Sequence, residues 1–141
     1  MSVEVRLVDG PLPHAQAWKV DGAGAVVLFE GVVRLLEEGR PLAALEYEVY
    51  EPMTSRQLQM LAQGVVDEHT LLALRCEHSF GRVPVGACSF RLAIAAAHRK
   101  PALAAMERFI DRMKLEAPIW KLPVWADGEA GHDKHGDEPQ E

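Results

Sequence analysis

The stretch AIAAAHRKPALAAMERFIDRMKLEAPIWK, residues 93–121, decides the fold because a strand and a helix meet in it at one short turn. Its small apolar residues complete a strand, the chain turns through His98, Arg99 and Lys100, and apolar residues then recur three and four apart. Pro101 suits a first helical position, so we expect a helix from residue 101 to about residue 117. The predicted core-facing stripe is Ala102, Met106, Phe109, Ile110 and Met113.

Strand patterns dominate the residues before this segment. Alternating or β-branched apolar runs predict strands over 3–8, 22–34, 43–51, 70–78 and 87–97, and Gly31 suggests a bulge in the second of them. A period of three to four predicts an amphipathic helix over 53–68. We also expect a short helix over 13–20 and a loop or hairpin over 79–86. Two principal helices inserted into a mainly antiparallel set of strands indicate the α+β class.

Composition predicts one globular domain. The chain has 141 residues, 48% of them hydrophobic, and no apolar run approaches the length of a membrane span. The acidic start MSVEVRLVDG does not resemble a signal peptide, so we expect a cytoplasmic protein with no membrane association. Cys76 and Cys88 are then expected to be reduced thiols, because they lack both a CxxC spacing and a secretory context.

Charge is distributed unevenly along the chain. Residues 127–141 hold six acids against one lysine and no large apolar side chain, so we expect a domain over 1–126 followed by an acidic flexible tail. Residues 91–121 hold seven bases against three acids, a balance of +4. Such a small basic region suits a small anion. It disfavours nucleic acid as a partner, because aromatic residues do not alternate with the lysine and arginine residues.

Cationic side chains collect at both ends of the predicted C-terminal helix. His98, Arg99 and Lys100 precede its free N–H groups, which outlines an anion site, although solvated turn residues have the same composition. Lys114 and Lys121 lie seven residues apart around Pro118. A lysine pair in a partly desolvated pocket suits acid and base chemistry near neutral pH, and surface lysines are the alternative.

Four motifs together indicate a family. GAVVLFEGVVR (24–34), LEYEVYEPM (45–53), VPVG (83–86) and IAAAHRKPALAAMERFIDRMKLEAPIWK (94–121) resemble, in this order, the large catalytic subunit of molybdopterin synthase over roughly residues 3–121. The resemblance implies a fold of the α/β hammerhead type. It also implies a homodimer within a heterotetramer, in which a small ubiquitin-like subunit binds at each end.

The resemblance further implies an enzyme that transfers sulfur. The partner carries a thiocarboxylate on its C-terminal Gly-Gly, and the sulfur passes to cyclic pyranopterin monophosphate in two transfers that build the molybdopterin dithiolene. No metal and no cofactor are expected. The alternative is a non-catalytic module that docks a ubiquitin-like protein or a small anion.

The site residues carried over from the resemblance fall into two groups. Lys114 and Lys121 match the catalytic lysines; Lys114 is expected nearest the sulfur-donating carbonyl, and Lys121 is expected to hold and polarise the pterin. The expected substrate-binding residues are Val32, Val33, Arg34, His98, Arg99, Leu122 and Pro123.

The chain also departs from the family pattern. Ser79 stands where an arginine is usual, Ala87 stands where a glutamate is common, and the asparagine that often follows the pocket arginine is missing. A further basic segment after residue 121 is replaced by LPVWADG and the acidic tail, which puts a contribution from the neighbouring subunit in doubt. His132 and His135 have a metal-compatible spacing, but a solvated glycine-rich tail is the preferred interpretation.

Overall fold

This computed structural model describes residues 2–128, which contain seven strands and two helices. In chain order the elements are β1 (Ser2–Asp9), β2 (Ala25–Val32), β3 (Leu36–Glu37), β4 (Arg40–Val49), α1 (Met53–His69), β5 (Ala73–Pro84), β6 (Cys88–Ala96), α2 (Arg99–Glu116) and β7 (Ile119–Trp125). The predicted α+β class is confirmed, as are the strands before residue 79 and the helix over 53–68.

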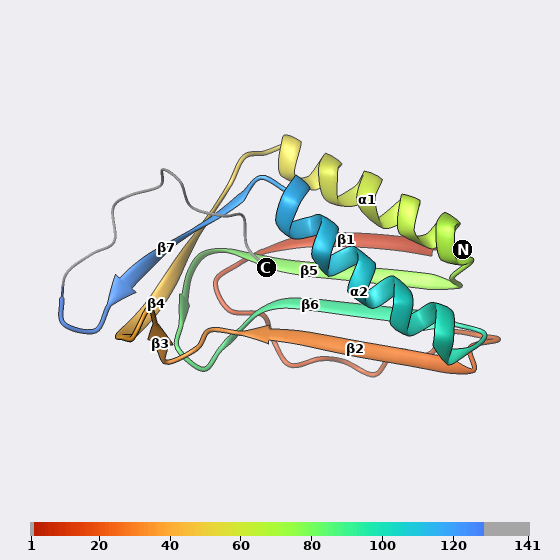
Figure 1. The fold of residues 1–141 in the computed structure, drawn as a ribbon, viewed down its shortest axis with the longest axis horizontal. Coiled ribbons are helices and arrows are strands. Elements are labelled where there is room, and N and C mark those ends of the chain that lie inside the picture. The colour runs from red at the N-terminus through yellow and green to blue at the C-terminus, as the bar shows by residue number, and fades with distance from the viewer. Residues whose placement is uncertain (1, 129–141) are drawn as a thin grey trace.

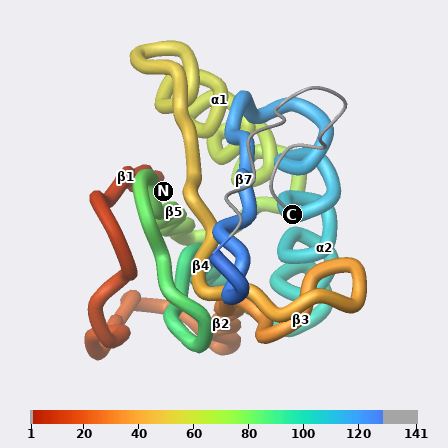
Figure 2. Tube along the Cα trace, turned by 90° about the vertical axis from the view of Figure 1, so that its left-hand side faces the viewer, coloured from red at the N-terminus to blue at the C-terminus, as the bar shows by residue number. Residues whose placement is uncertain are grey.

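The main sheet has the strand order β1, β5, β6, β2, and both helices cover one of its faces (Figure 1). Within residues 2–128 only β1 and β5 pair in parallel, and the other neighbouring strands are antiparallel. Figure 2, turned by 90°, shows α1 and α2 on one side of the strands and the residues that follow β1 on the other side. The helices therefore lie on one face of the main sheet, and the opposite face is called the open face below.

The strand β5 connects this sheet to a smaller one. Its first part pairs with β1 and β6, and its end, from Gly81 to Pro84, pairs with β4, which in turn pairs with β7. Gly81 has φ +79°, and a Cβ there would lie 2.7 Å from the Asp9 carboxylate, so a glycine allows the bend. Of the loop or hairpin predicted over 79–86, the hairpin is confirmed, because β5 continues through Pro84 and a tight turn leads into its antiparallel neighbour β6.

The core lies between the helices and the main sheet. Facing pairs such as Leu74 with Ile94 and Cys76 with Leu92 present one apolar surface from β5 and β6, and Phe109 of α2 is fully buried against this core. The predicted stripe on α2 is confirmed at four positions, with Ile110 only partly buried and Ala105 added. Burial of this surface is what fixes the helices on the sheet.

Residues 10–24 cross the open face without regular structure. The short helix predicted over 13–20 was wrong, since those residues form no helix. Tertiary contacts replace it: the Arg91 guanidinium donates a 2.6 Å hydrogen bond to the Pro13 carbonyl, and the Arg75 guanidinium lies over the Trp18 ring. Weak local helix propensity was overridden by these contacts.

Beneath this segment, charged side chains of alternating sign form a ladder across β1, β5, β6 and β2. Arg91 Nε lies 2.7 Å from Glu30, and its Nη1 lies 3.2 Å from Glu77. Arg6 extends the ladder to Glu77 and Glu4. Arg91 and Glu77 are both nearly fully buried. Each of these charges therefore needs its oppositely charged neighbours to compensate for the water that it has lost.

Neither helix within residues 2–128 has the length and apolar character that crossing a membrane requires. The predicted acidic tail begins at residue 127, where Asp127 pairs with Arg40 at 2.7 Å. The rest of the tail, with His132 and His135, lies outside the described residues.

Candidate functional site

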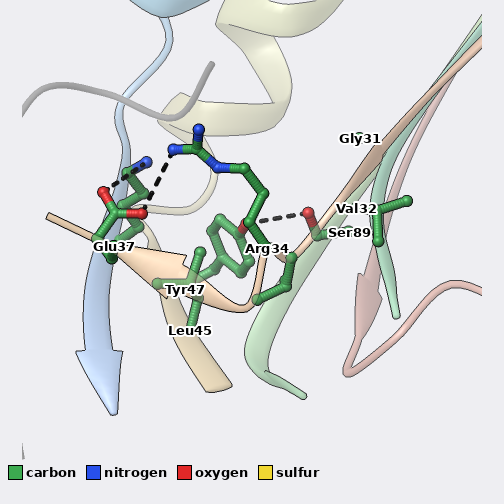
Figure 3. Close-up of a pocket in the computed structure, with 9 residues that line it drawn as sticks. Gly31, Val32, Arg34, Glu37, Leu45, Tyr47 and Ser89 are labelled. Carbon is green, nitrogen blue, oxygen red and sulfur yellow. Dashed lines mark hydrogen bonds and ion pairs between the residues drawn. The ribbon is translucent and has the colours of Figure 1, made fainter. Parts of the chain in front are cut away.

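A small open hollow lies where the main sheet meets the smaller one, and it contains two cations from distant parts of the sequence. Arg34 follows β2, and Lys121 belongs to β7. Figure 3 shows the Arg34 side chain reaching across the hollow toward Glu37, above Tyr47. The lining residues are Gly31, Val32, Val33, Arg34, Glu37, Leu45, Tyr47, Ser89 and Lys121.

Backbone hydrogen bonds on both sides hold the segment that carries Arg34. The Val33 N–H donates to the Ala87 carbonyl at 3.0 Å, and the Gly86 N–H donates to the Val33 carbonyl at 2.9 Å. The Leu42 N–H donates to the Leu35 carbonyl at 2.8 Å. With the backbone fixed before and after it and Val33 buried, Arg34 is held at the rim, where its side chain is 70% exposed and open to a ligand.

Lys121 reaches the same hollow through a strand that the sequence patterns did not predict. Ile119 is fully buried, and β7 then pairs antiparallel with β4, which places Lys121 opposite Tyr47. The Lys121 side chain is only 19% exposed. A partly desolvated ammonium of this kind interacts with an anion more strongly than one in bulk water does.

Glu37 lies between the two cations. One carboxylate oxygen is 3.5 Å from Arg34 Nη2, and the other is 3.8 Å from Lys121 Nζ. The residue belongs to the short strand β3, which returns into β4 through a tight turn at Glu38 and Gly39, both with positive φ. The hollow therefore already holds one internal anion in contact with both cations.

Two hydroxyl groups form the floor of the hollow. The Tyr47 hydroxyl and Ser89 Oγ lie 2.9 Å apart in a buried hydrogen bond, drawn as a dashed line in Figure 3. The pairing of β2 with β6 shifts between Gly31 and Val32 so that Ser89 is skipped, which confirms the bulge that Gly31 predicted, although the extra residue is on β6. Bulges redirect side chains, and here the bulge accompanies the turn of Ser89 toward the hollow.

His78 lies behind this floor, with its ring edge against Tyr47 at a centroid distance of 5.2 Å. Its Nδ1–H donates to the Ser79 carbonyl at 2.8 Å, which leaves Nε2 as a buried acceptor without a partner among the described residues. Burial lowers the pKa of His78 to about 4, so the ring is neutral near pH 7. Ser79, the departure from the family's arginine, is also fully buried.

The structure does not bring His98 and Arg99 to this hollow within one chain. They lie at the start of α2, which is about 27 Å long. Figure 1 shows that this helix begins at one end of the main sheet, whereas β3 and β7 lie at the other end. The predicted helix start at residue 101 was wrong: the helix begins at Arg99, with His98 at the N-cap position, and Pro101 is its third residue, a position whose N–H has no helical partner in any case. This end has no side-chain cap and no acid in its first turn.

The other predicted site residues lie nearer. Val32 and Val33 line the hollow. Leu122 and Pro123 continue β7 beyond Lys121, opposite Glu46 and Leu45, and are partly buried without lining it. Lys114 is exposed on the last turn of α2 and is not among the lining residues.

The basic region predicted over 91–121 does not form one cationic surface. Arg91 belongs to the ladder on the open face, and Arg112 and Arg108 pair with Glu116 and Glu68. Cys76 and Cys88 are free thiols, as predicted, and burial raises the pKa of both. Within residues 2–128, no three His, Cys, Asp or Glu side chains are grouped so that they would hold a metal ion.

Known proteins resemble this chain both in sequence and in fold. It is 40% identical over 107 residues to a molybdopterin synthase catalytic subunit of Aspergillus niger, which covers 76% of this chain and 59% of that protein. A subunit of the same description from Bacillus subtilis is 36% identical over 107 residues, covering 76% of this chain and 68% of that protein. The chain thus spans less than two thirds of the first of these relatives.

Solved structures agree with these relatives. A molybdopterin synthase from Staphylococcus aureus superimposes with a TM-score of 0.78 at 28% identity, covering 90% of this chain and 95% of that one. A complex of subunits 1 and 2 of the molybdopterin-converting factor from Helicobacter pylori gives 0.74 at 25% identity, covering 96% and 93%. Residues 9–116, which include both helices and Arg34, match the model of the MoaE protein family, and the chain belongs to that family.

Proposed function

We propose that this protein is the catalytic subunit of a molybdopterin synthase. It would receive sulfur from the C-terminal thiocarboxylate of a small ubiquitin-like partner and transfer it to cyclic pyranopterin monophosphate in two rounds. Membership of the MoaE family and the likeness to subunits with this description support the proposal. The H. pylori structure is itself a complex of two different subunits, which supports a protein as the sulfur donor.

One observation carries the proposal: Arg34 and Lys121, which are far apart in sequence, meet at one hollow with hydroxyl groups beneath them. A guanidinium and an ammonium suit a phosphate ester, because both make charge-assisted hydrogen bonds to its oxygens. In this proposal Arg34 orients the phosphate and Lys121 polarises the pterin. In each transfer the donor's carbon–sulfur bond breaks, a carbon–sulfur bond forms on the pterin in place of a carbon–oxygen bond, and water added to the donor leaves it as a carboxylate.

The remaining predicted residues enter the proposal by their positions. Backbone at Val32 and Val33 would line the pterin site, and Leu122 and Pro123 would fix the strand that carries Lys121. Lys114 would serve the incoming thiocarboxylate from the end of α2, where its exposure leaves it accessible to a partner's tail. The test is one assay with purified chain, thiocarboxylated partner and pterin precursor, in which product is identified by mass. A complex that assembles but forms no product would instead indicate a docking module.

Lys114 has a prediction of its own. Replacing it with alanine should lower product formation about 100-fold while the complex with the partner still assembles, because the variant loses an exposed acid or base and keeps its fold. Product formation and size-exclusion elution are measured on the same sample. Full activity would exclude Lys114 from the mechanism and leave Lys121 as the catalytic lysine.

His98 and Arg99 require a second copy of the chain in this proposal, because one chain holds them away from Arg34 and Lys121. A homodimer that places the start of α2 beside the partner copy's hollow would complete the phosphate site. The alternating apolar side chains exposed along the edge strand β2, at Val26, Leu28 and Val32, support a protein contact there.

Mixing two impaired variants tests the shared site. Arg99→Ala should raise the Michaelis constant for the pterin about tenfold or more, since a charge-assisted contact is lost. If one site combines Arg99 of one copy with Lys121 of the other, an equal mixture of Arg99→Ala and Lys121→Ala chains regains about a quarter of the wild-type rate at low substrate. A mixture no more active than the average of its components would contradict a shared site.

The proposal also assigns the heterotetramer to the cytoplasm. The free thiols of Cys76 and Cys88 support this compartment, because thiols stay reduced there.

A further inference from the structure

Glu37 occupies the place where the proposed function puts the substrate's phosphate. Its two carboxylate oxygens face Arg34 Nη2 at 3.5 Å and Lys121 Nζ at 3.8 Å, and the residue itself lines the hollow. We propose that Glu37 is a built-in competitor for the anion, and that its side chain must swing away from Arg34 and Lys121 before a phosphate group binds. This inference rests on the proposed function and adds a residue that sets substrate affinity.

The contact distances suit exchange better than permanent structure. Both exceed the range of a normal hydrogen bond, so the carboxylate is held mainly by charge. The Arg34 side chain is 70% exposed, and an ion pair open to water contributes little to stability. Inorganic phosphate near pH 7 carries more charge and more acceptor oxygens than one carboxylate, and the cyclic phosphate of the substrate matches its single charge, so either anion can exchange with this side chain.

The local backbone allows the side chain to leave without unfolding its surroundings. Glu37 lies on a strand of two residues at the tip of a hairpin, and the turn that follows has two residues with positive φ. Glu37 is only partly buried, and Leu36 beside it is exposed. A rotation about the side-chain bonds of Glu37 moves its carboxylate into solvent while β4 and β7 keep Lys121 in place.

The competing interpretation is that Glu37 holds the two cations in position for the substrate. The two interpretations predict opposite signs for one variant. Glu37→Gln keeps the shape of the side chain and removes its charge. A competitor should make binding tighter when its charge is lost, while a positioning group should make it weaker.

Calorimetric titration of the full-length chain with inorganic phosphate measures this sign directly. We expect Glu37→Gln to bind phosphate about 3- to 10-fold more tightly than the wild type, the amount expected for releasing two partly exposed ion pairs. Glu38→Gln is the matched control, because it removes the same charge from the next residue, which is exposed and does not line the hollow. Its phosphate affinity should change less than twofold. Unchanged or weaker binding in Glu37→Gln would overturn the inference, as would an equal gain in both variants.

A second titration identifies which anion Glu37 mimics. A Gly-Gly dipeptide represents the carboxylate end of the partner's tail. We expect its affinity to change less than twofold in Glu37→Gln, and a gain for the dipeptide without one for phosphate would overturn the assignment to the phosphate.

The kinetic counterpart separates this inference from the proposed function. In the complete assay, Glu37→Gln should lower the Michaelis constant for the pterin 3- to 10-fold with kcat within twofold of the wild type. If the wild-type chain forms no molybdopterin, the proposed function fails, while the phosphate titration still decides whether Glu37 competes for the anion. If the wild type is active and the titration shows no gain, the inference alone fails.

Discussion

Replacing Lys121 with alanine is expected to reduce product formation about 1,000-fold, within the range that loss of a general acid or base produces. Lys121 is the least exposed of the two cations in the hollow, and a paired strand fixes its backbone. The variant loses the charge that would polarise the pterin. Single-turnover formation of molybdopterin with saturating partner and precursor measures the chemical step.

Two controls separate this loss from general damage. Lys19→Ala removes an exposed lysine from the segment on the open face and should leave the rate within twofold of the wild type. The Lys121→Ala chain should also form the complex with its partner and unfold at a similar urea concentration, because its side chain is not part of the core. A rate within tenfold of the wild type would exclude Lys121 from the chemistry.

Much of the scaffold could be predicted because local patterns and tertiary packing agree there. The alternation of Phe90, Leu92 and Ile94 predicts a strand, and Leu92 and Ile94 face the core from β6. The period of three and four in α1 likewise matches its buried face. Arg34 and Lys121 were singled out by resemblance to a family, and the structure places both beside one hollow.

The residues that complete the hollow carried no signal in the sequence. Gly31 indicated a bulge in this region, but the sequence did not show that the extra residue would be Ser89 of β6 or that Ser89 would meet Tyr47. Glu37 belongs to a two-residue strand, which is too short for periodicity to detect. The strand β7 was not predicted because Pro123 interrupts the strand pattern in the sequence and because most residues of β7 are only partly buried.

The basic region predicted over 91–121 does not form one cationic surface, and the reason is related. A count of charges along the chain does not say which face of a strand each side chain occupies. Arg91 and His98 are seven residues apart, yet Arg91 belongs to the open face of the sheet and His98 to the start of a helix. The ion pairs of Arg91 and Arg108 are formed with acids from β2, β5 and α1, which only the fold brings near them, whereas Arg112 pairs with Glu116 one helical turn away.

Arg91→Met is expected to lower the free energy of unfolding by about 3 to 5 kcal/mol, the cost of removing one partner from a buried ion pair. The Glu77 carboxylate is 8% exposed and would lose a partner at 3.2 Å. Glu30 would lose its 2.7 Å contact and the Pro13 carbonyl its donor. Since a domain of this kind is stable by only about 5 to 15 kcal/mol, urea denaturation should show a large fall in the midpoint at an unchanged slope.

Two further variants show whether the buried charge is the cause. Arg112→Met breaks an exposed pair with Glu116 within α2 and should cost only about 0.5 kcal/mol, although the same side chain is exchanged. The double variant Arg91→Met with Glu77→Leu removes both buried charges and should recover most of the loss, because an apolar pair of similar size avoids the desolvation of both ions. A double variant as unstable as Arg91→Met alone would mean that packing of the long side chain against residues 10–24 matters more than its charge.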